Sequence, residues 1–329
     1  MSDSPAAPTR TPVPPQWTPT KLPNVTGKTV IVTGGATGLG YHTALELARR
    51  GAAVIIAAHL EEQGTEAVQK IQDEIKDAEI QGGKAVYMHL DVSDLSSVKA
   101  FAAKFTEAYE RLDVLVLNAG ILSPTHKLTV DGYELEFATN YLGHFALTAQ
   151  LMDVMRKNPE QARILTVSSV LHKRAAPFNA EQLMVMEPEK FNRIQVYCQT
   201  KLYVLLFTSE LHRRLQAKGI TNVISVGTHP GVVSTNMMDT DLSDLGLKTW
   251  IAFKAASKLM HTADFGALPI MYAAAAPGVL GGEYYGPDGV LSIYGYPTHD
   301  TMSPAAQSED FAKQLWAKSE ELTKLKFDL

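Results

Sequence analysis

The sequence contains almost no cysteine, no excess of basic residues and no long apolar run. The single cysteine, Cys198, excludes an intramolecular disulfide framework and favours a reducing compartment. The formal net charge of −5 provides no basic surface for nucleic acid. No run of about 18 apolar residues is present, so no integral membrane segment is expected, and no secretory signal pattern opens the chain. We therefore expect a cytoplasmic protein.

The ten histidines and one cysteine show no metal-ligand spacing, so no metal site is predicted. Residues 1–22 are rich in proline, which removes backbone donors and disfavours helix, so they are predicted to form a flexible or extended tail. Trp17 either holds this tail against the body or is solvated. The rest of the chain, 23–329, is predicted to be one domain.

From Lys28 onward, short apolar runs alternate with amphipathic stretches such as 38–51 and 97–112. The runs are rich in β-branched residues, as expected of strands that are buried on both faces. They occupy residues 28–34, 52–58, 84–90, 113–119, 163–169 and 222–228, with a further short strand near 282–285. This alternation predicts an α/β single-domain Rossmann fold: a doubly wound parallel sheet of about seven strands with helices on both faces.

A glycine-rich segment, TGGATGLG, joins the first predicted strand to the first helix. Glycines there allow the backbone to turn sharply and approach a pyrophosphate, which the N-terminus of the following helix then binds. The alternative is a tight turn without a ligand. The context favours a dinucleotide site formed by Gly34, Thr37, Gly38, Leu39 and Gly40.

The second predicted strand ends in Ala57-Ala58-His59, without the carboxylate that would accept the 2′-hydroxyl of NAD. The space is compatible with the 2′-phosphate of NADP, and His59 could help to bind this phosphate. The alternative is that His59 is a simple surface residue. NADP is therefore favoured over NAD. Further cofactor contacts are expected where the third, fourth and sixth strands end: Asp91, Val92, Asn118, Ala119, Gly120, Pro230, Gly231, Val233 and Thr235.

Tyr197 and Lys201 are four residues apart in a predicted long helix, 196–215, and so share one of its faces. A tyrosine pKa near 10 is too high for proton transfer at neutral pH. A neighbouring ammonium, aided by an oxidised nicotinamide, would lower the pKa of Tyr197, and Lys201 could also bind the nicotinamide ribose. By itself such a pair is usually a helix-surface contact.

Three further polar side chains support a catalytic interpretation. Ser168 and Ser169 end a strand at the same sheet edge, where a hydroxyl could stabilise a substrate oxygen, or cap a helix. Asn140 lies on the preceding helix, where its amide could hold a water that relays protons to Lys201, or could be a core amide.

Together these motifs resemble the short-chain dehydrogenase/reductase family: TGGATGLG, Asp91, Asn118-Ala119-Gly120, Asn140, the serine pair, Tyr-x-x-x-Lys and HPGVVST. The resemblance implies a catalytic tetrad of Asn140, Ser169, Tyr197 and Lys201, with Ser168 in support. The stretches TNYLGHFALT, VSSVLHK and YCQTKLYVLLF are most similar to the retinol dehydrogenase and WW-domain oxidoreductase-like branch. That branch often has arginine in place of His59, and many members have a membrane-anchoring N-terminus.

The resemblance also implies that residues 236–262 form a lid over the substrate. Its Met, Leu, Trp and Phe side chains favour a mainly apolar substrate, although any of them could instead pack on the core. Residues 170–196, with Leu171, His172, Phe178 and Phe191, form either another pocket wall or a surface excursion.

We therefore predict an NADP(H)-dependent oxidoreductase that transfers a hydride between nicotinamide and a secondary alcohol or carbonyl of a small molecule. The alternatives are an NAD-dependent alcohol dehydrogenase, a catalytically idle cofactor-binding scaffold, and an epimerase or dehydratase of the extended relatives. A homodimer through helices 131–158 and 193–217 is possible, as in related enzymes.

Overall fold

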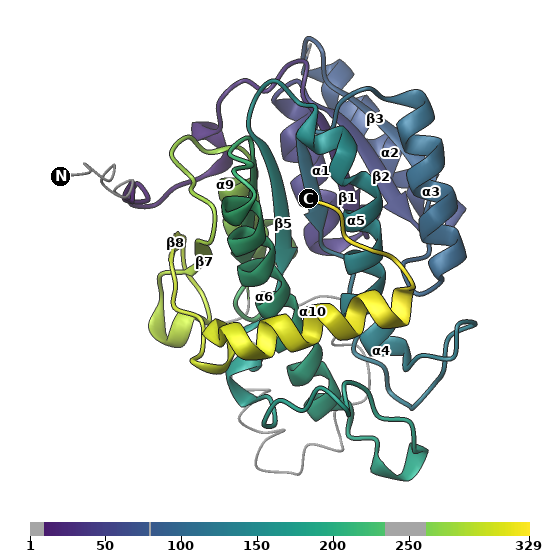
Figure 1. Ribbon diagram of the computed structural model, residues 1–329. Helices are drawn as coiled ribbons and strands as arrows, with labels where there is room; N and C mark the ends of the chain where they lie inside the picture. Colours follow the sequence, from purple (N-terminus) through teal and green to yellow (C-terminus); the bar gives the residue numbers. More distant parts are fainter. Residues whose placement is uncertain (1–9, 79, 234–260) are drawn as a thin grey trace, which may run out of the picture.

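The computed structural model describes residues 10–78, 80–233 and 261–329 (Figure 1). Its centre is an eight-stranded sheet in the order β3-β2-β1-β4-β5-β6-β7-β8. The first seven strands are parallel to their neighbours, and β8 is antiparallel to β7. The strands are β1 (Thr29–Thr33), β2 (Ala53–Ala58), β3 (Lys84–His89), β4 (Val114–Leu117), β5 (Ala162–Val167), β6 (Val223–Thr228), β7 (Tyr284–Pro287) and β8 (Pro297–His299). The predicted doubly wound parallel sheet is confirmed, with one antiparallel edge strand added.

The strand order predicts a ligand crevice at one edge of the sheet. β1 pairs with β2 on one side and β4 on the other, so successive units are added in opposite directions from β1. In such sheets ligands bind beyond the carboxyl ends of the strands at this reversal. All five residues of β1 are buried, because helices cover both of its faces. The end of β1 at Thr33 is therefore the expected centre of a site.

Helices cover both faces of the sheet. Apolar side chains of β1, β2 and β4 alternate between two core clusters, one shared with α1, α2 and α9 and the other with α3, α5 and α6. The helices are α1 (Gly38–Arg49), α2 (Glu61–Asp77), α3 (Leu95–Ala108), α4 (Leu135–Phe137), α5 (Gly143–Arg156), α6 (Arg193–Ala217), α8 (Ala263–Gly266), α9 (Leu268–Ala275) and α10 (Glu309–Thr323). A π-helical turn, Ala138–Leu142, joins α4 to α5. Within the described ranges, no helix has both the length and the hydropathy to cross a membrane.

Helix α10 crosses in front of α6 and α5 (Figure 1). Its Trp316 packs against Phe145 of α5 and Phe207 of α6, with ring centroids 5.2 and 5.9 Å away, and against Phe327 at 4.7 Å. Trp316 is almost fully buried. The aromatic face that α5 and α6 present to Trp316 is therefore covered by α10.

The described part of the proline-rich segment, residues 10–22, lies against the domain. Trp17 is 2% exposed, and its ring meets that of Tyr272 on α9 edge-on, with centroids 5.2 Å apart. Leu22 is also buried. Of the two alternatives for Trp17, contact with the body is the one observed. The nine residues before this part lie outside the described residues.

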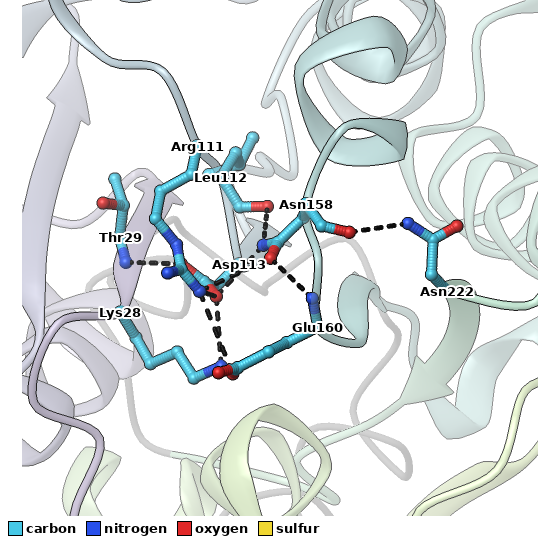
Figure 2. Close-up of polar contacts among 8 residues, drawn as sticks. All are labelled: Lys28, Thr29, Arg111, Leu112, Asp113, Asn158, Glu160 and Asn222. Atoms are coloured by element: carbon cyan, nitrogen blue, oxygen red, sulfur yellow. Dashed lines mark hydrogen bonds and ion pairs between the residues drawn. The ribbon is translucent and has the colours of Figure 1, made fainter.

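A buried carboxylate organises the edge of the sheet where β1, β4 and β5 begin (Figure 2). Asp113 accepts hydrogen bonds from the backbone amide of Thr29 (2.9 Å), from Arg111 Nε (2.9 Å) and from Asn158 Nδ2 (3.0 Å). Lys28 Nζ lies 3.2 Å from the same carboxylate. The network ties three segments together at the edge opposite to the crevice.

Candidate active site

The predicted phosphate loop forms a close backbone cradle. Gly34 and Gly38 have positive φ values of 62° and 55°, which glycine adopts without strain. A Cβ at Gly40 would lie 2.3 Å from the carbonyl oxygen of Gly34, so only glycine fits there. No side chain among the described residues caps α1 at Thr37. The N–H groups of the first turn, which includes Leu39, are therefore available to a pyrophosphate, and the loop fits a dinucleotide.

Thr33, at the end of β1, fixes the Asn118-Ala119-Gly120 segment beside this loop. Its Oγ1 accepts hydrogen bonds from the amides of Asn118 and Ala119, both at 2.9 Å, and lies 2.9 Å from Nε2 of His144. Asn118 Nδ2 donates to the carbonyl oxygen of Thr33 at 2.9 Å. The Asn118 side chain thus positions the loop backbone. Sequence reasoning missed Thr33 and His144, because their roles depend on contacts between segments far apart in the chain.

The residues predicted to contact the adenosine lie at neighbouring strand ends. His59 is exposed directly after β2. Asp91 follows β3, and its Oδ1 accepts from the amide and hydroxyl of Ser93 at 2.9 and 2.7 Å. Val92 is buried, and its carbonyl oxygen would be 1.8 Å from a Cβ at Gly143, so the segment that follows β3 approaches the start of α5 closely. Asp94 caps α3 by accepting from the amides of the first turn.

Tyr197 and Lys201 lie on one face of α6, as their spacing predicts. Lys201 Nζ is 5.4 Å from the centroid of the Tyr197 ring and donates to the carbonyl oxygen of Val167 at 2.9 Å. The same Nζ lies 3.3 Å from the position of a Cβ at Gly120. The ammonium group therefore reaches the crevice between the ends of β4 and β5.

The pKa values of this pair are set mainly by burial. Burial raises the pKa of Tyr197 above its usual value; the charge of Glu136 raises it further, and a hydrogen bond with Ser169 lowers it. Burial lowers the pKa of Lys201 to about 8. Among the protein's own side chains, desolvation of the phenolate therefore dominates the pKa of Tyr197, and its predicted lowering by Lys201 together with an oxidised nicotinamide stays a prediction. Glu136 is fully buried on α4, and sequence reasoning missed it.

The two serines have different environments. Ser168 Oγ is buried and donates to the carbonyl oxygen of Lys201 at 2.8 Å, so it holds α6 against the end of β5. Ser169 caps the short 3-10 helix Val170–Arg174, where its Oγ accepts from the amide of Leu171 at 3.2 Å. Ser169 is also the serine that hydrogen-bonds the Tyr197 side chain. This arrangement is compatible with a substrate contact at Ser169 and a supporting role for Ser168.

Asn140 lies in the π-helical turn and connects two segments of the site. Its Nδ2 donates to the carbonyl oxygen of Ile121 (3.0 Å) and to Thr200 Oγ1 (3.1 Å), and its Oδ1 accepts from the amide of Ile121 (2.7 Å). Both amide protons are therefore used within the protein. A water held by this amide, which would relay protons to Lys201, stays a prediction that depends on the remaining lone pair of Oδ1.

The predicted contacts after β6 lie only partly within the described residues. Pro230 is half-buried, and Gly231 has a φ of 74° and would place a Cβ 2.2 Å from the carbonyl oxygen of Ile293. Val233 is buried. A Cβ at Gly266 would lie 2.3 Å from Val233 and 3.2 Å from Leu39, so the turn at 230–233 approaches the start of α1. Thr235 and the predicted lid up to residue 260 lie outside the described residues.

The segment 170–196 lines part of a cavity of about 180 Å³, but none of the four predicted catalytic residues lines it, so the role of this segment as a wall of the substrate pocket stays a prediction. Phe178 stacks on Phe311 of α10 at 4.9 Å, and Phe191 meets the ring of His126. Neither phenylalanine lines the cavity. Its lining residues are Phe137, Ala176, Pro177, Asn179, Gln182, Leu183, Met184, Val185, Gln195, Val196, Gln199 and Thr200.

Comparison with known proteins identifies the family. Residues 28–181 match the family model described as short chain dehydrogenase. Human retinol dehydrogenase 13 is 35% identical over 311 residues, covering 92% of this chain and 86% of that protein. The chain therefore belongs to the short-chain dehydrogenase family and is an NAD(P)-dependent oxidoreductase that acts on alcohol or carbonyl groups.

Other relatives agree with this assignment. Human polyprenol dehydrogenase is 34% identical over 305 residues, covering 90% of this chain and 85% of that protein. A solved structure described as an uncharacterised protein from Mycobacterium paratuberculosis is 36% identical, with a TM-score of 0.75, and covers 95% of this chain and 99% of that one. The relatives are consistent with the retinol dehydrogenase branch.

Proposed function

We propose that this enzyme transfers a hydride between NADP(H) and a secondary alcohol or carbonyl of a largely apolar small molecule. One observation carries the proposal: the glycine cradle, the Tyr197–Lys201 pair and Ser169 converge at the carboxyl edge of the sheet around β1, β4 and β5. A catalytically idle scaffold would have no need for this convergence. Nicotinamide, when bound, supplies or accepts the hydride.

The side chains of the site donate the proton, stabilise the substrate oxygen and bind the cofactor. The raised pKa of Tyr197 keeps its phenol protonated at neutral pH, and this is the form that donates a proton to a carbonyl oxygen during reduction. Ser169 stabilises the same oxygen as it gains negative charge. Lys201, charged below pH 8, binds the ribose hydroxyls and stabilises the phenolate left after proton transfer. Asn140 holds Ile121 and Thr200 in place around them.

The preference for NADP is supported by His59 at the end of β2, where the chain has no carboxylate to repel a 2′-phosphate. We expect His59→Asp to raise the KM for NADPH about tenfold, a loss of about 1.4 kcal/mol, and to leave the KM for NADH unchanged or lower. His59→Ala is the matched control, because it removes the imidazole without adding a negative charge. A wild-type enzyme that prefers NADH would overturn this part of the proposal.

The apolar character of the substrate is supported by the names of two relatives, retinol dehydrogenase 13 and polyprenol dehydrogenase. The test follows nicotinamide absorbance with NADPH against a panel of aldehydes and ketones of increasing apolar surface. We expect turnover to increase along the series, and we expect Tyr197→Phe to abolish it.

Tyr203→Phe is the control on the same helix, because Tyr203 lies in the aromatic core against Tyr141 and Phe137. Full activity of Tyr197→Phe would refute the mechanism.

Homodimerisation also stays a prediction. Association through the aromatic face of α5 and α6 would have to displace α10, which buries Trp316 on that face. We therefore propose that any homodimer of this chain uses another surface, and light scattering at increasing protein concentration would test this.

A further inference from the structure

Two buried histidine rings connect the active site to the segment that follows β8. His229 lies 2.7 Å from Asp300, measured from Nε2 to Oδ2, and its Nδ1 accepts from the amide of Gly231 at 3.2 Å. His172 Nε2 accepts from the amide of Ser303 at 3.1 Å. The Nδ1 of His172 lies 2.6 Å from the carbonyl oxygen of Ser169. The ring of His229 thus contacts the turn 229–233, called the cofactor turn, and the ring of His172 contacts the loop 168–172, called the serine loop.

The backbone partners determine the tautomer of each ring. Because the amide of Gly231 is a donor, Nδ1 of His229 carries the lone pair and Nε2–H donates to Asp300. Because the amide of Ser303 is a donor, Nε2 of His172 carries the lone pair and Nδ1–H donates to the carbonyl of Ser169. Each ring must be neutral to make both of its contacts, since a second proton would face a backbone N–H.

Packing holds both rings in place. The two histidines are at most 1% exposed, and both rings contact the ring of Tyr284 on β7, at 5.8 Å for His172 and 5.1 Å for His229. A Cβ at Gly286 would lie 1.8 Å from Nε2 of His229, so no larger residue fits beside that ring. Alternative positions for either imidazole are therefore restricted.

We propose that His172, His229, Asp300 and Ser303, together called the histidine clamp, are positioning residues that hold the serine loop and the cofactor turn at a fixed separation. The clamp joins Ser169, which would contact the substrate oxygen, to Pro230-Gly231, which would contact the cofactor. Its catalytic relevance rests on the proposed roles of these residues. The mechanical coupling between the serine loop and the cofactor turn does not depend on those roles.

Acidification should release the clamp. The groups that face the two rings are Asp300, Lys173 and Tyr284, and each ring also faces the other. Burial, reinforced by Lys173, lowers the pKa of His172 to about 4, and burial also lowers the pKa of His229. The unfolded chain therefore takes up protons first as the pH falls below 6.5, and the stabilisation by the clamp is lost from there down to about pH 4.

Hydrogen–deuterium exchange tests the coupling without turnover. We would compare peptides that cover the serine loop (168–172) and the cofactor turn (229–233). His172→Phe keeps the ring contact but loses both hydrogen bonds, and should accelerate exchange in the distant turn peptide at least fivefold. His229→Phe should do the same to the serine-loop peptide. His126→Phe is the control, because His126 contacts Val185 and Phe191 away from the clamp.

Acceleration confined to the substituted histidine's own peptide, or none at all, would overturn the clamp. If a phenylalanine variant does not fold, Asp300→Ala removes the partner of His229 from a largely buried but solvent-reachable position and should accelerate exchange in the serine-loop peptide.

In kinetics, His229→Phe should raise the Kd for NADPH about tenfold, whereas His172→Phe should lower kcat about tenfold with a smaller effect on that Kd. Coupled exchange in a protein without oxidoreductase activity would refute the proposed function and leave the clamp intact.

Discussion

Asp113→Asn should destabilise the protein strongly while sparing the active site. Asp113 is 1% exposed and accepts from Thr29, Arg111 and Asn158, with Lys28 close by (Figure 2). The asparagine amide would point N–H groups at these donors and remove the charge that compensates the cations. Hydrogen bonds to a charged group contribute about 1.5–3 kcal/mol each, reduced here because Arg111 and Lys28 are partly exposed. We expect a loss of about 2–4 kcal/mol in the free energy of unfolding.

Urea unfolding followed by tryptophan fluorescence measures this loss. Asp153→Asn is the control, because the side chain of Asp153 is 82% exposed. This substitution should change the free energy of unfolding by no more than about 0.5 kcal/mol. Activity per folded molecule should be unchanged, since the network lies at the edge of the sheet opposite to the crevice. An unfolding free energy of Asp113→Asn within about 0.5 kcal/mol of wild type would refute the reasoning.

The pH dependence gives a second test. Burial raises the pKa of Asp113, but its hydrogen-bond donors and the nearby cations outweigh burial and hold this pKa below its usual 3.8. The stabilisation from its charged form is therefore complete above that value and is lost as the pH falls through the folded-state pKa. The difference in the free energy of unfolding between wild type and Asp113→Asn should be constant from pH 7 down to about pH 4 and should decrease below that pH. A difference that grew on acidification would contradict the assignment.

Three further predictions address the cofactor site and the N-terminal segment. Gly40→Ala, whose Cβ would lie 2.3 Å from the carbonyl oxygen of Gly34, should raise the Kd for NADPH more than tenfold in a fluorescence titration; an unchanged Kd would contradict the cradle. Wild-type affinity for NADPH should fall as the pH rises through about 8, where Lys201 loses its charge, and Lys201→Met should lack this dependence. Trp17→Ala should free the segment around Lys21, so that trypsin cleaves there faster; equal cleavage of both proteins would show that contact with Tyr272 does not hold it.

Much of the fold is predictable because its strands are short apolar runs separated by helical stretches. β8 is the exception, since three residues that include Pro297 and His299 have no detectable period and form a strand only by pairing with β7. The single helix expected over 131–158 is instead α4, a π-helical turn and α5. That turn contains Asn140, whose side chain bonds outside the helix, and no sequence period shows this.

The site is predictable where chemistry follows local spacing. Tyr197 and Lys201 share a helix face because they are four residues apart, and the glycine loop lies between a strand and a helix. Thr33, Glu136 and His144 were not predicted as parts of the site because their contacts join distant segments. The same limit applies to the pKa of Tyr197: the sequence shows the nearby lysine but not the burial that dominates it.

The position of α10 has a consequence for the synthesis of the chain. A ribosome releases Phe145 and Phe207 long before Trp316, so the aromatic face of α5 and α6 stays without its cover until α10 has emerged. We expect nascent chains to expose this apolar surface until α10 emerges and to be recognised there by chaperones. Closure by α10 is a contact of large sequence separation, and such contacts form late and slowly.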